Sequence, residues 1–249
     1  EMARSFFNPD ITRLPDPFLI KDMDKAVSRI IKAIHCQEKT LLYGDYDVDG
    51  TTAVALMYQY LKRIPVETNI GFYIPDRNTE GYGLSSKGID FAKNENFTLI
   101  ITLDCGITST ELIENAPDSI DFIICDHHIP GNKLPPAIAI LNPKQKDCNY
   151  TFKELCGCGI AFKLICAINQ QYGFPGEYCL EYIELVAIAI GADIVTMTGE
   201  NRVLCFHGLK KLNSKPTMGI RALMEVAGSG FYDNYKSVFQ LAPRINAAG

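Results

Sequence analysis

Hydrophobic and polar positions alternate between two patterns along the first 155 residues. Short runs without polar alternation, typical of strands buried on both faces, occur at Thr40–Tyr43, Asn69–Ile74, Leu99–Leu103, Phe122–Cys125 and Ala137–Leu141. Segments with helical spacing of apolar residues lie around them, at Asp24–Ile34, Thr51–Ile64, Ser86–Asn94 and Ser109–Asn115. Strands without polar alternation that alternate with helices belong to parallel sheets. We therefore predict an α/β fold with a mostly parallel five-stranded sheet flanked by helices.

The pattern changes near residue 156. Beyond it, the spacing predicts helices at about 159–171, 178–190, 200–212 and 217–227, and no strand. The first 24 residues are rich in proline and aspartate, which predicts an irregular lead-in. We thus expect three segments: a lead-in over 1–24, an α/β core with the chemical motifs over 25–155, and a helical part over 156–249.

The composition is that of an ordinary globular protein, with 47% hydrophobic and 21% charged residues among 249. The longest apolar stretch, Leu185–Ala192, is far shorter than the roughly 20 residues of a membrane-spanning helix. We therefore expect no contact with a membrane. The nine cysteines form no CxxC pair, which indicates reduced thiols and a cytoplasmic location.

The net charge of −5 is unevenly distributed. Residues 1–125 contain 12 lysines and arginines against 19 aspartates and glutamates, a balance of −7, whereas the remainder has a balance of +2. Domains that bind nucleic acid are generally basic. The acidic first half must therefore use its carboxylates for another purpose.

Three of the predicted strands end in acidic or imidazole groups. The motifs that follow them are Gly44-Asp45-Tyr46-Asp47-Val48-Asp49-Gly50, Asp104-Cys105-Gly106 and Asp126-His127-His128. Because the carboxyl ends of parallel strands line one crevice, we expect these groups to converge. So many carboxylates would repel one another without cations. Oxygen ligands mixed with imidazole suit Mn²⁺, Mg²⁺ or Zn²⁺, so we predict two divalent ions, with Mn²⁺ preferred.

Other interpretations of these motifs differ in strength. An EF-hand loop that begins at Asp45 would place Leu56 where a bidentate glutamate is required, which excludes it. A single aspartate at the end of an element often only caps a turn or helix, and this alternative stays open for Asp104 and for Asp193. Gly157 and Gly159 are compatible either with a phosphate close to the backbone or with close helix packing.

The three motifs resemble successive signatures of the DHH phosphoesterase superfamily. Further stretches resemble its single-strand-specific exonucleases, in order from about Phe7 to the last residue. They are Tyr73-Ile74-Pro75-Asp76-Arg77, Glu80-Gly81-Tyr82-Gly83, Leu141-Asn142-Pro143-Lys144, Gly157-Cys158-Gly159-Ile160-Ala161-Phe162-Lys163, Gly199-Glu200-Asn201-Arg202 and Pro243-Arg244-Ile245-Asn246-Ala247-Ala248-Gly249.

The resemblance implies a bacterial, cytoplasmic enzyme that degrades single-stranded DNA from its 5′ end into 5′-mononucleotides in repair and recombination. It also implies a single-strand-binding protein and a repair helicase as partners, and a second domain beyond a linker that starts near residue 249. Two alternatives stay open within the superfamily: a phosphodiesterase for oligonucleotides or cyclic dinucleotides, and a non-catalytic DHH scaffold.

The resemblance also assigns roles to particular residues. The implied metal ligands are Asp45, Asp47, Asp49, Asp104, His127 and Asp193, of which Asp104 would bridge both ions. It leaves open which two of Asp45, Asp47 and Asp49 bind directly. The implied catalytic residues are Asp104, His128, which would face the scissile phosphate, and Asp126, which would orient its neighbours. The candidates for substrate binding are Arg77, Tyr82, Arg244 and Asn246.

Overall fold

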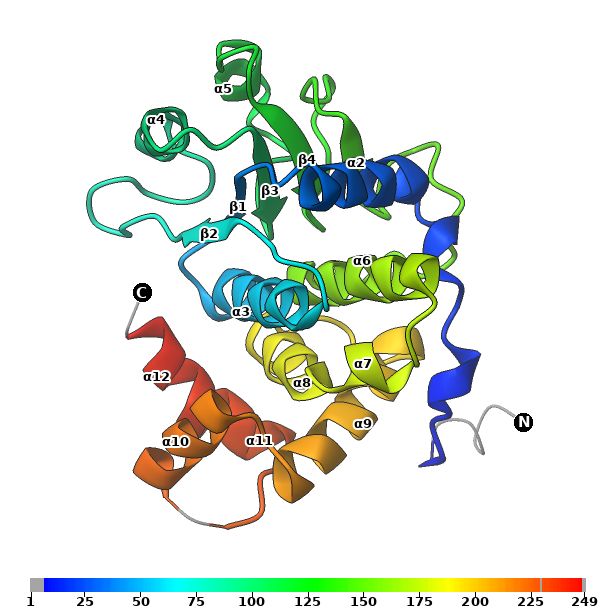
Figure 1. Cartoon of the computed structure of the whole chain (residues 1–249). Coiled ribbons are helices and arrows are strands. Elements are labelled where there is room, and N and C mark those ends of the chain that lie inside the picture. The colour runs from blue at the N-terminus through cyan, green and yellow to red at the C-terminus, as the bar shows by residue number, and fades with distance from the viewer. Residues whose placement is uncertain (1–6, 229, 248–249) are drawn as a thin grey trace.

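The computed structural model describes residues 7–228 and 230–247, and it confirms the predicted α/β fold (Figure 1). The sheet consists of β1 (Thr40–Gly44), β2 (Ile70–Tyr73), β3 (Leu99–Leu103), β4 (Asp121–Cys125) and β5 (Ala139–Leu141). Its order is β2-β1-β3-β4-β5, and every neighbouring pair is parallel. The five predicted strands are thus all present, with ends shifted by at most two residues.

Helices cover both faces of this sheet (Figure 1). One face carries α4 (Ser86–Asn94) and α5 (Thr110–Glu114), and the other carries α2 (Met23–His35), α3 (Val48–Arg63) and α6 (Gly157–Tyr172). Successive residues of a strand point to opposite faces. Leu41 therefore packs in the cluster under α4 and α5, whereas Leu42 packs in the larger cluster under the other three helices. Burial on both faces explains why β1, β3, β4 and β5 lack polar alternation, whereas β2 at the edge is only partly buried.

The second half of the described chain is helical, as predicted. It comprises α7 (Glu177–Leu180), α8 (Ile183–Ala192), α9 (Gly199–Ser214), α10 (Met218–Ala227), α11 (Asn234–Lys236), a π-helical turn (Ser237–Leu241) and α12 (Ala242–Asn246). The prediction of one helix over 178–190 is wrong, because Tyr182 leaves helical geometry at φ −115° and ψ 11°. Its hydroxyl donates instead to the Gln59 carbonyl of α3.

The predicted lead-in contains two short 3₁₀ turns, Ile11–Arg13 and Pro17–Leu19. Asp10 and Asp16 cap them by accepting hydrogen bonds from backbone N–H groups two residues further on. Residues 1–6 of that lead-in lie outside the described residues. The three-segment division itself stays a prediction.

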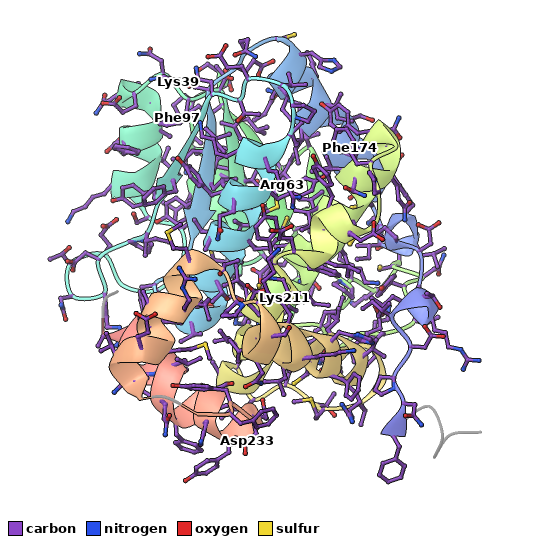
Figure 2. All side chains as sticks on the ribbon, turned by 60° about the horizontal axis from the view of Figure 1, so that its bottom comes forward. Lys39, Arg63, Phe97, Phe174, Lys211 and Asp233 are labelled. Carbon is purple, nitrogen blue, oxygen red and sulfur yellow. The ribbon has the colours of Figure 1, made fainter. Side chains whose placement is uncertain are left out.

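Polar contacts join surface segments outside the apolar clusters. Lys39, which precedes β1, donates to the Glu95 carbonyl at 2.8 Å, and its ammonium lies 5.4 Å from the centre of the Phe97 ring (Figure 2). At the end of α3, Arg63 pairs with Glu181 at 2.6 Å. These contacts tie loops to the ends of regular elements.

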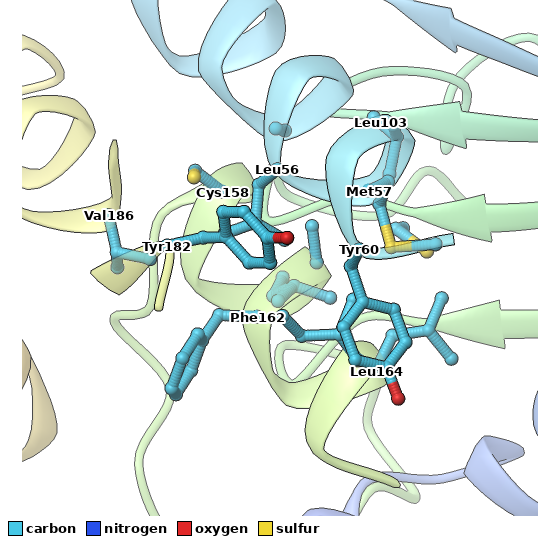
Figure 3. Close-up of a cluster of buried hydrophobic side chains, with 14 of the residues drawn as sticks. Leu56, Met57, Tyr60, Leu103, Cys158, Phe162, Leu164, Tyr182 and Val186 are labelled. Atoms are coloured by element: carbon cyan, nitrogen blue, oxygen red, sulfur yellow. The ribbon is translucent and has the colours of Figure 1, made fainter. Parts of the chain in front are cut away.

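One buried cluster connects the sheet to the helical part. Tyr60 of α3, Phe162 of α6, Val186 of α8 and Leu103 of β3 all belong to this cluster, and Figure 3 shows Leu103 next to Met57 of α3. All five side chains are essentially inaccessible to solvent. The helical part therefore shares the core of the α/β part and packs directly against the strand that leads to Asp104.

Two expectations from composition can be compared with the structure. Within the described residues, no helix combines the length and apolar character that crossing a bilayer requires. All nine cysteines lie among the described residues, and each is a free thiol, as predicted.

Candidate metal centre

Strand register brings three aspartates to the same level. Gly44, Leu103 and Cys125 are register partners across β1, β3 and β4. The next residues along the chain are Asp45, Asp104 and Asp126, and at most 1% of the surface of each is exposed. Their convergence at the carboxyl edge of the sheet confirms the expectation from strand order. Asp104 adopts a left-handed backbone (φ 65°), a strained conformation that is common at functional sites.

Asp49 reaches the same place from a helix. The predicted helix over Thr51–Ile64 begins earlier than expected, at Val48, because the side chain of Asp47 accepts a hydrogen bond from the Gly50 N–H at 3.0 Å and caps it. Asp49 therefore lies in the first turn of α3, where it is 2% exposed. Its two carboxylate oxygens accept hydrogen bonds from the first N–H groups of α6.

These donors are the N–H groups of Gly157 and Cys158, at 2.6 and 2.7 Å. The N-terminus of α6 thus binds a carboxylate of the protein, as its dipole and unpaired N–H groups favour. A Cβ at position 157 would lie 2.5 Å from Oδ1 of Asp104, so the glycine makes room for this aspartate. For Gly157, the structure therefore favours close packing over a bound phosphate.

His127 lies at the centre of the cluster. Its Nε2 is 3.2 Å from Asp104 Oδ1, 3.6 Å from Asp193 Oδ2 and 3.9 Å from Asp49 Oδ2. Asp193 ends α8 as its C-cap, and Ile194 after it has a left-handed φ of 55°, unusual for a β-branched residue. The candidate ligand that follows the apolar helix is thus brought to the strand ends, some 66 residues from His127 in sequence.

Two overlapping sets of side chains have metal-ligand geometry. Asp104, His127 and His128 form one, and Asp49, His127 and Asp193 form the other, each with ligand atoms within 4.8 Å of one another. Asp104 and His127 belong to these sets, and Asp104 Oδ1 and both ring nitrogens of His127 are buried without a hydrogen-bond partner in the described chain. Asp45 Oδ2, outside both sets, is likewise buried without a partner there. Buried acceptors are normally satisfied, so a cation fits this donor set.

The electrostatics of the cluster agree with that fit. Burial, and next the Asp49 carboxylate, raise the pKa of Asp104 well above its ordinary value. Burial raises the pKa of Asp49 to about 7, with Asp193 adding to the shift, and burial raises the pKa of Asp193 to about 6. Burial lowers the pKa of His127 to about 4, which leaves a neutral imidazole with a lone pair for a metal. His127 therefore supplies no positive charge to the carboxylates around it.

The other two aspartates of the first motif occupy different positions. One oxygen of Asp45 accepts the Gly83 N–H at 3.0 Å, while the other is buried without a partner in the described chain. Asp47 is half-buried, and one of its oxygens caps α3. Asp49, in contrast, belongs to a ligand set. Which of the three bind metal directly stays a prediction.

His128 is held by Asp126. The Asp126 carboxylate accepts the His128 Nδ1–H at 2.7 Å, the His128 backbone N–H at 3.0 Å and the Ile107 N–H at 2.9 Å. The hydrogen bond to Asp126 raises the pKa of His128, in opposition to partial burial. The Tyr82 hydroxyl lies 3.0 Å from Nε2 of His128 and donates to the Asp104 carbonyl at 3.2 Å. His128 is thereby contacted from both sides, and the orienting role that the resemblance implies for Asp126 stays a prediction.

The substrate-binding candidates separate into two groups. Arg77 and Tyr82 lie near the cluster: the Arg77 guanidinium is 4.5 Å from the Tyr46 ring centre, and Tyr46 meets Tyr82 edge-on at 6.3 Å. Arg244 instead donates to the Gln240 carbonyl in its own helical turn.

Asn246, on the same helix as Arg244, has a buried Oδ1 without a partner in the described residues. Its neighbour Ile245 lines a hollow with Thr51 and Thr52 of α3, so α12 lies beside the first half of that helix. The described contacts of Arg244 and Asn246 do not include the acidic cluster, and their roles stay predictions. Residues 248–249 of the final motif lie outside the described residues.

Sequence reasoning missed the backbone donors of the site. The N–H groups of Gly157, Cys158 and Gly83 hold the carboxylates of Asp49 and Asp45, but no side-chain pattern reports a backbone contact. The only sequence feature that pointed to these contacts was the presence of glycine at positions 83 and 157, in stretches that resemble the single-strand-specific exonucleases.

Comparison with known proteins defines the class of the chain. The model of the DHH family, N-terminal domain, matches residues 39–190, which include all the described strands and five of the six implied metal ligands. The chain belongs to the DHH family. The sixth implied ligand, Asp193, lies three residues beyond the matched range.

Several relatives that match this chain are exonucleases named RecJ. The single-stranded-DNA-specific exonuclease RecJ of Bacillus subtilis (strain 168) is 41% identical over the whole chain, which spans 31% of that protein. A crystal structure of exonuclease RecJ bound to manganese is 32% identical, with a TM-score of 0.81 over 94% of this chain and 58% of that one. RecJ of Thermus thermophilus in complex with Mn²⁺ is 28% identical, with a TM-score of 0.80 over 98% and 34% of the two chains. The chain spans between 31% and 43% of the length of the RecJ relatives that it matches.

Proposed function

We propose that the chain is the catalytic part of a metal-dependent exonuclease that hydrolyses single-stranded DNA from the 5′ end into 5′-mononucleotides. The observation that carries the proposal is the buried group of Asp49, Asp104, His127 and Asp193, which has the ligand atoms for divalent cations and no lysine or arginine paired with it in the described chain. RecJ relatives, two of them in manganese-bound structures, support the substrate class.

The residues present fit Mn²⁺, with Mg²⁺ as an alternative, because they combine carboxylate oxygens with imidazole nitrogen. Asp49, Asp104, His127 and Asp193 would hold the ions, with the partnerless oxygen of Asp45 as a further ligand. When bound, such ions lower the pKa of a water molecule and neutralise the charge that develops on a phosphodiester.

The remaining residues bind and orient the substrate. His128 is held by Asp126 through Nδ1, so its Nε2 is available to donate to a phosphate oxygen once Tyr82 yields that position. Arg77 supplies a guanidinium over the ring of Tyr46, which meets the ring of Tyr82 edge-on, and Tyr82 is 52% accessible. Cations next to aromatic rings are a common arrangement for single-stranded nucleic acid.

The proposal is tested by hydrolysis of end-labelled DNA. A long single strand, the matching duplex and a dinucleotide are incubated with the chain in Mn²⁺ or in EDTA, beside Asp104→Ala. We expect hydrolysis of the single strand only, in Mn²⁺ only, with mononucleotides as first products, and background rates for the variant. Faster hydrolysis of the dinucleotide would favour an oligonucleotide phosphodiesterase.

A separate calorimetric titration with Mn²⁺ detects the metal centre without any reaction. Binding by the parent chain that is lost in Asp104→Ala supports the centre, whereas absence of binding to both would favour a non-catalytic scaffold. The cytoplasmic location and the partners, a single-strand-binding protein and a repair helicase, remain part of the proposal through the resemblance alone.

A further inference from the structure

The loop between β2 and α4, residues 74–85, carries both Arg77 and Tyr82, yet it contains no helix or strand. Tyr82 lies between Gly81 and Gly83, whose φ angles of 80° and 81° belong to the left-handed region. The two glycines therefore give the backbone the most freedom on either side of Tyr82, the residue through which the loop contacts His128. Such a loop needs other contacts if it is to hold the Tyr82 hydroxyl within hydrogen-bond distance.

Glu80 supplies these contacts. Its carboxylate accepts hydrogen bonds from the Tyr73 hydroxyl at 2.9 Å, the Asp76 N–H at 3.0 Å and the Ser85 hydroxyl at 2.6 Å. Tyr73 is the last residue of β2, and Ser85 is the N-cap of α4. One carboxylate thus ties the beginning, the middle and the end of the loop together.

The network continues from Ser85 to the metal centre. The Ser85 N–H donates at 3.1 Å to the hydroxyl of Tyr43, a fully buried residue of β1. That hydroxyl donates in turn to the Gly83 carbonyl at 3.1 Å, and the Gly83 N–H donates to Asp45 at 3.0 Å. A continuous chain of hydrogen bonds therefore runs from Glu80 to the metal-centre carboxylate of Asp45.

Glu80 itself does not take part in the chemistry. It belongs to neither ligand set, and its hydrogen-bond partners in the described chain all lie within or next to the loop. It is nevertheless only two residues from Tyr82, whose hydroxyl contacts both His128 and the Asp104 carbonyl.

We propose that Glu80 is a positioning residue, which acts through Ser85 and Tyr43 to hold Tyr82 and Gly83 against the metal centre. The inference rests on the proposed function, because that function supplies the substrate beside which the loop must be held. Outer contacts that orient a metal centre typically contribute 10- to 100-fold to affinity or activity.

The test compares Glu80→Ala with Asp90→Ala, an exposed carboxylate on the neighbouring helix α4. Hydrogen exchange is measured first, on the metal-free proteins. We expect the amides of residues 81–83 to exchange at least about 10-fold faster in Glu80→Ala, while those of β1 and β3 keep the parental rate. Unchanged exchange at 81–83, or equally faster exchange throughout the chain, would overturn the proposal.

Steady-state hydrolysis of a single strand then tests whether Glu80 acts through Tyr82. We expect kcat/KM to fall about 10- to 100-fold in Glu80→Ala and in Tyr82→Phe, and the double variant to lose little more than either one, because both remove the same contact. Glu80→Gln should recover part of the loss, because its carbonyl oxygen still accepts one donor. Additive effects would overturn the proposal.

The two hypotheses fail separately. If the parent chain does not hydrolyse single strands, the proposed function is wrong for this chain, yet the exchange rates at 81–83 still decide whether Glu80 orders the loop. If the parent chain is active and Glu80→Ala matches Asp90→Ala in both measurements, only the positioning role is wrong.

Discussion

The backbone N–H of Gly157 donates a 2.6 Å hydrogen bond to the carboxylate of Asp49, a residue 108 positions earlier in the chain. The same glycine lies against Asp104, because a Cβ in its place would be 2.5 Å from both Cβ and Oδ1 of that aspartate. One residue at the start of α6 thus sets the positions of two candidate metal ligands.

Gly157→Ala is therefore expected to weaken Mn²⁺ binding by about 10- to 100-fold, because either Asp104 or the first turn of α6 must move. A calorimetric titration measures the change. The matched control is Gly159→Ala, where the new Cβ would meet Leu155 Cδ2 at 3.4 Å, an ordinary contact. The control should bind like the parent. Equal affinity in both variants would contradict the role given to Gly157.

The stability of the metal-free chain should depend on pH near neutrality. With a pKa of about 7, Asp49 holds a proton in the folded chain that the unfolded carboxyl, near 3.8, has released. The folded state therefore binds more protons, and the free energy of unfolding falls as the pH rises through about 7. The slope contributed by this group is at most about 1.4 kcal/mol per pH unit.

His127 has the opposite effect on the free energy of unfolding, but only below pH 6.5, the ordinary pKa of histidine. Above that pH it is neutral in both the folded and the unfolded state. Urea unfolding between about pH 6.5 and 8 in EDTA measures this slope, to which His128, with its raised pKa, contributes equally in the parent and in a variant that keeps it, so the difference between the two reports the changed carboxylate. Asp49→Asn should flatten the profile, and saturating Mn²⁺ should reverse the loss by binding the folded state. The same slope in Asp49→Asn would exclude Asp49 as its source.

Asp126→Asn should lower the pKa of His128, because the hydrogen bond to Asp126 is the largest cause of its increase. The chain has only four histidines, so their ring protons can be followed by NMR across pH and the His128 signal assigned with His128→Asn. Asp121→Asn, which alters a carboxylate paired with Arg29, is the control and should leave that signal unchanged. An unaltered His128 titration in Asp126→Asn would contradict the assignment.

Lys163→Met should destabilise the chain strongly without touching the metal centre. Lys163 and Glu200 pair at 2.6 Å with side chains only 2% and 6% exposed, and Tyr150 donates to the same carboxylate at 2.9 Å. Removing the lysine leaves a buried glutamate without its counter-charge, at a cost of about 3–5 kcal/mol. Urea unfolding measures this cost.

The control for that substitution is Arg63→Met in the surface pair with Glu181, whose side chains are 35% and 42% exposed (Figure 2). Exposed pairs contribute about 1 kcal/mol or less. The double variant Lys163→Met/Glu200→Gln should also lose less than the sum of its single variants, since it leaves no unpaired charge. Similar losses for Lys163→Met and Arg63→Met would show that burial of the ion pair carries no special cost.

Local pattern was sufficient for the elements of the α/β half. The strands β1, β3, β4 and β5 are short apolar runs because both faces of the sheet are covered there, and each is followed directly by a polar residue. The spacing of apolar residues gave wrong helix bounds where a single residue breaks or caps a helix. Tyr182 divides the helix expected over 178–190, and Asp47 starts α3 three residues earlier than expected. Apolar spacing carries no information about either event, because caps and breaks depend on individual side chains.

Strand order made the convergence of Asp45, Asp104 and Asp126 predictable, since parallel register places the residues after Gly44, Leu103 and Cys125 at one level. The sequence did not determine the position of Asp193, which depends on how α8 packs against α3 and α6. Asp49 is likewise placed by packing, because its carboxylate accepts the first N–H groups of α6.

The residue types of the candidate ligands could therefore be predicted from the sequence, because residue types and strand ends are local properties. The hydrogen bonds that hold them were decided by packing: the α6 amides on Asp49, Gly83 on Asp45 and Tyr82 on His128 join segments that are distant in sequence. Such contacts depend on how helices and loops pack together in three dimensions, and no periodicity along a chain specifies that.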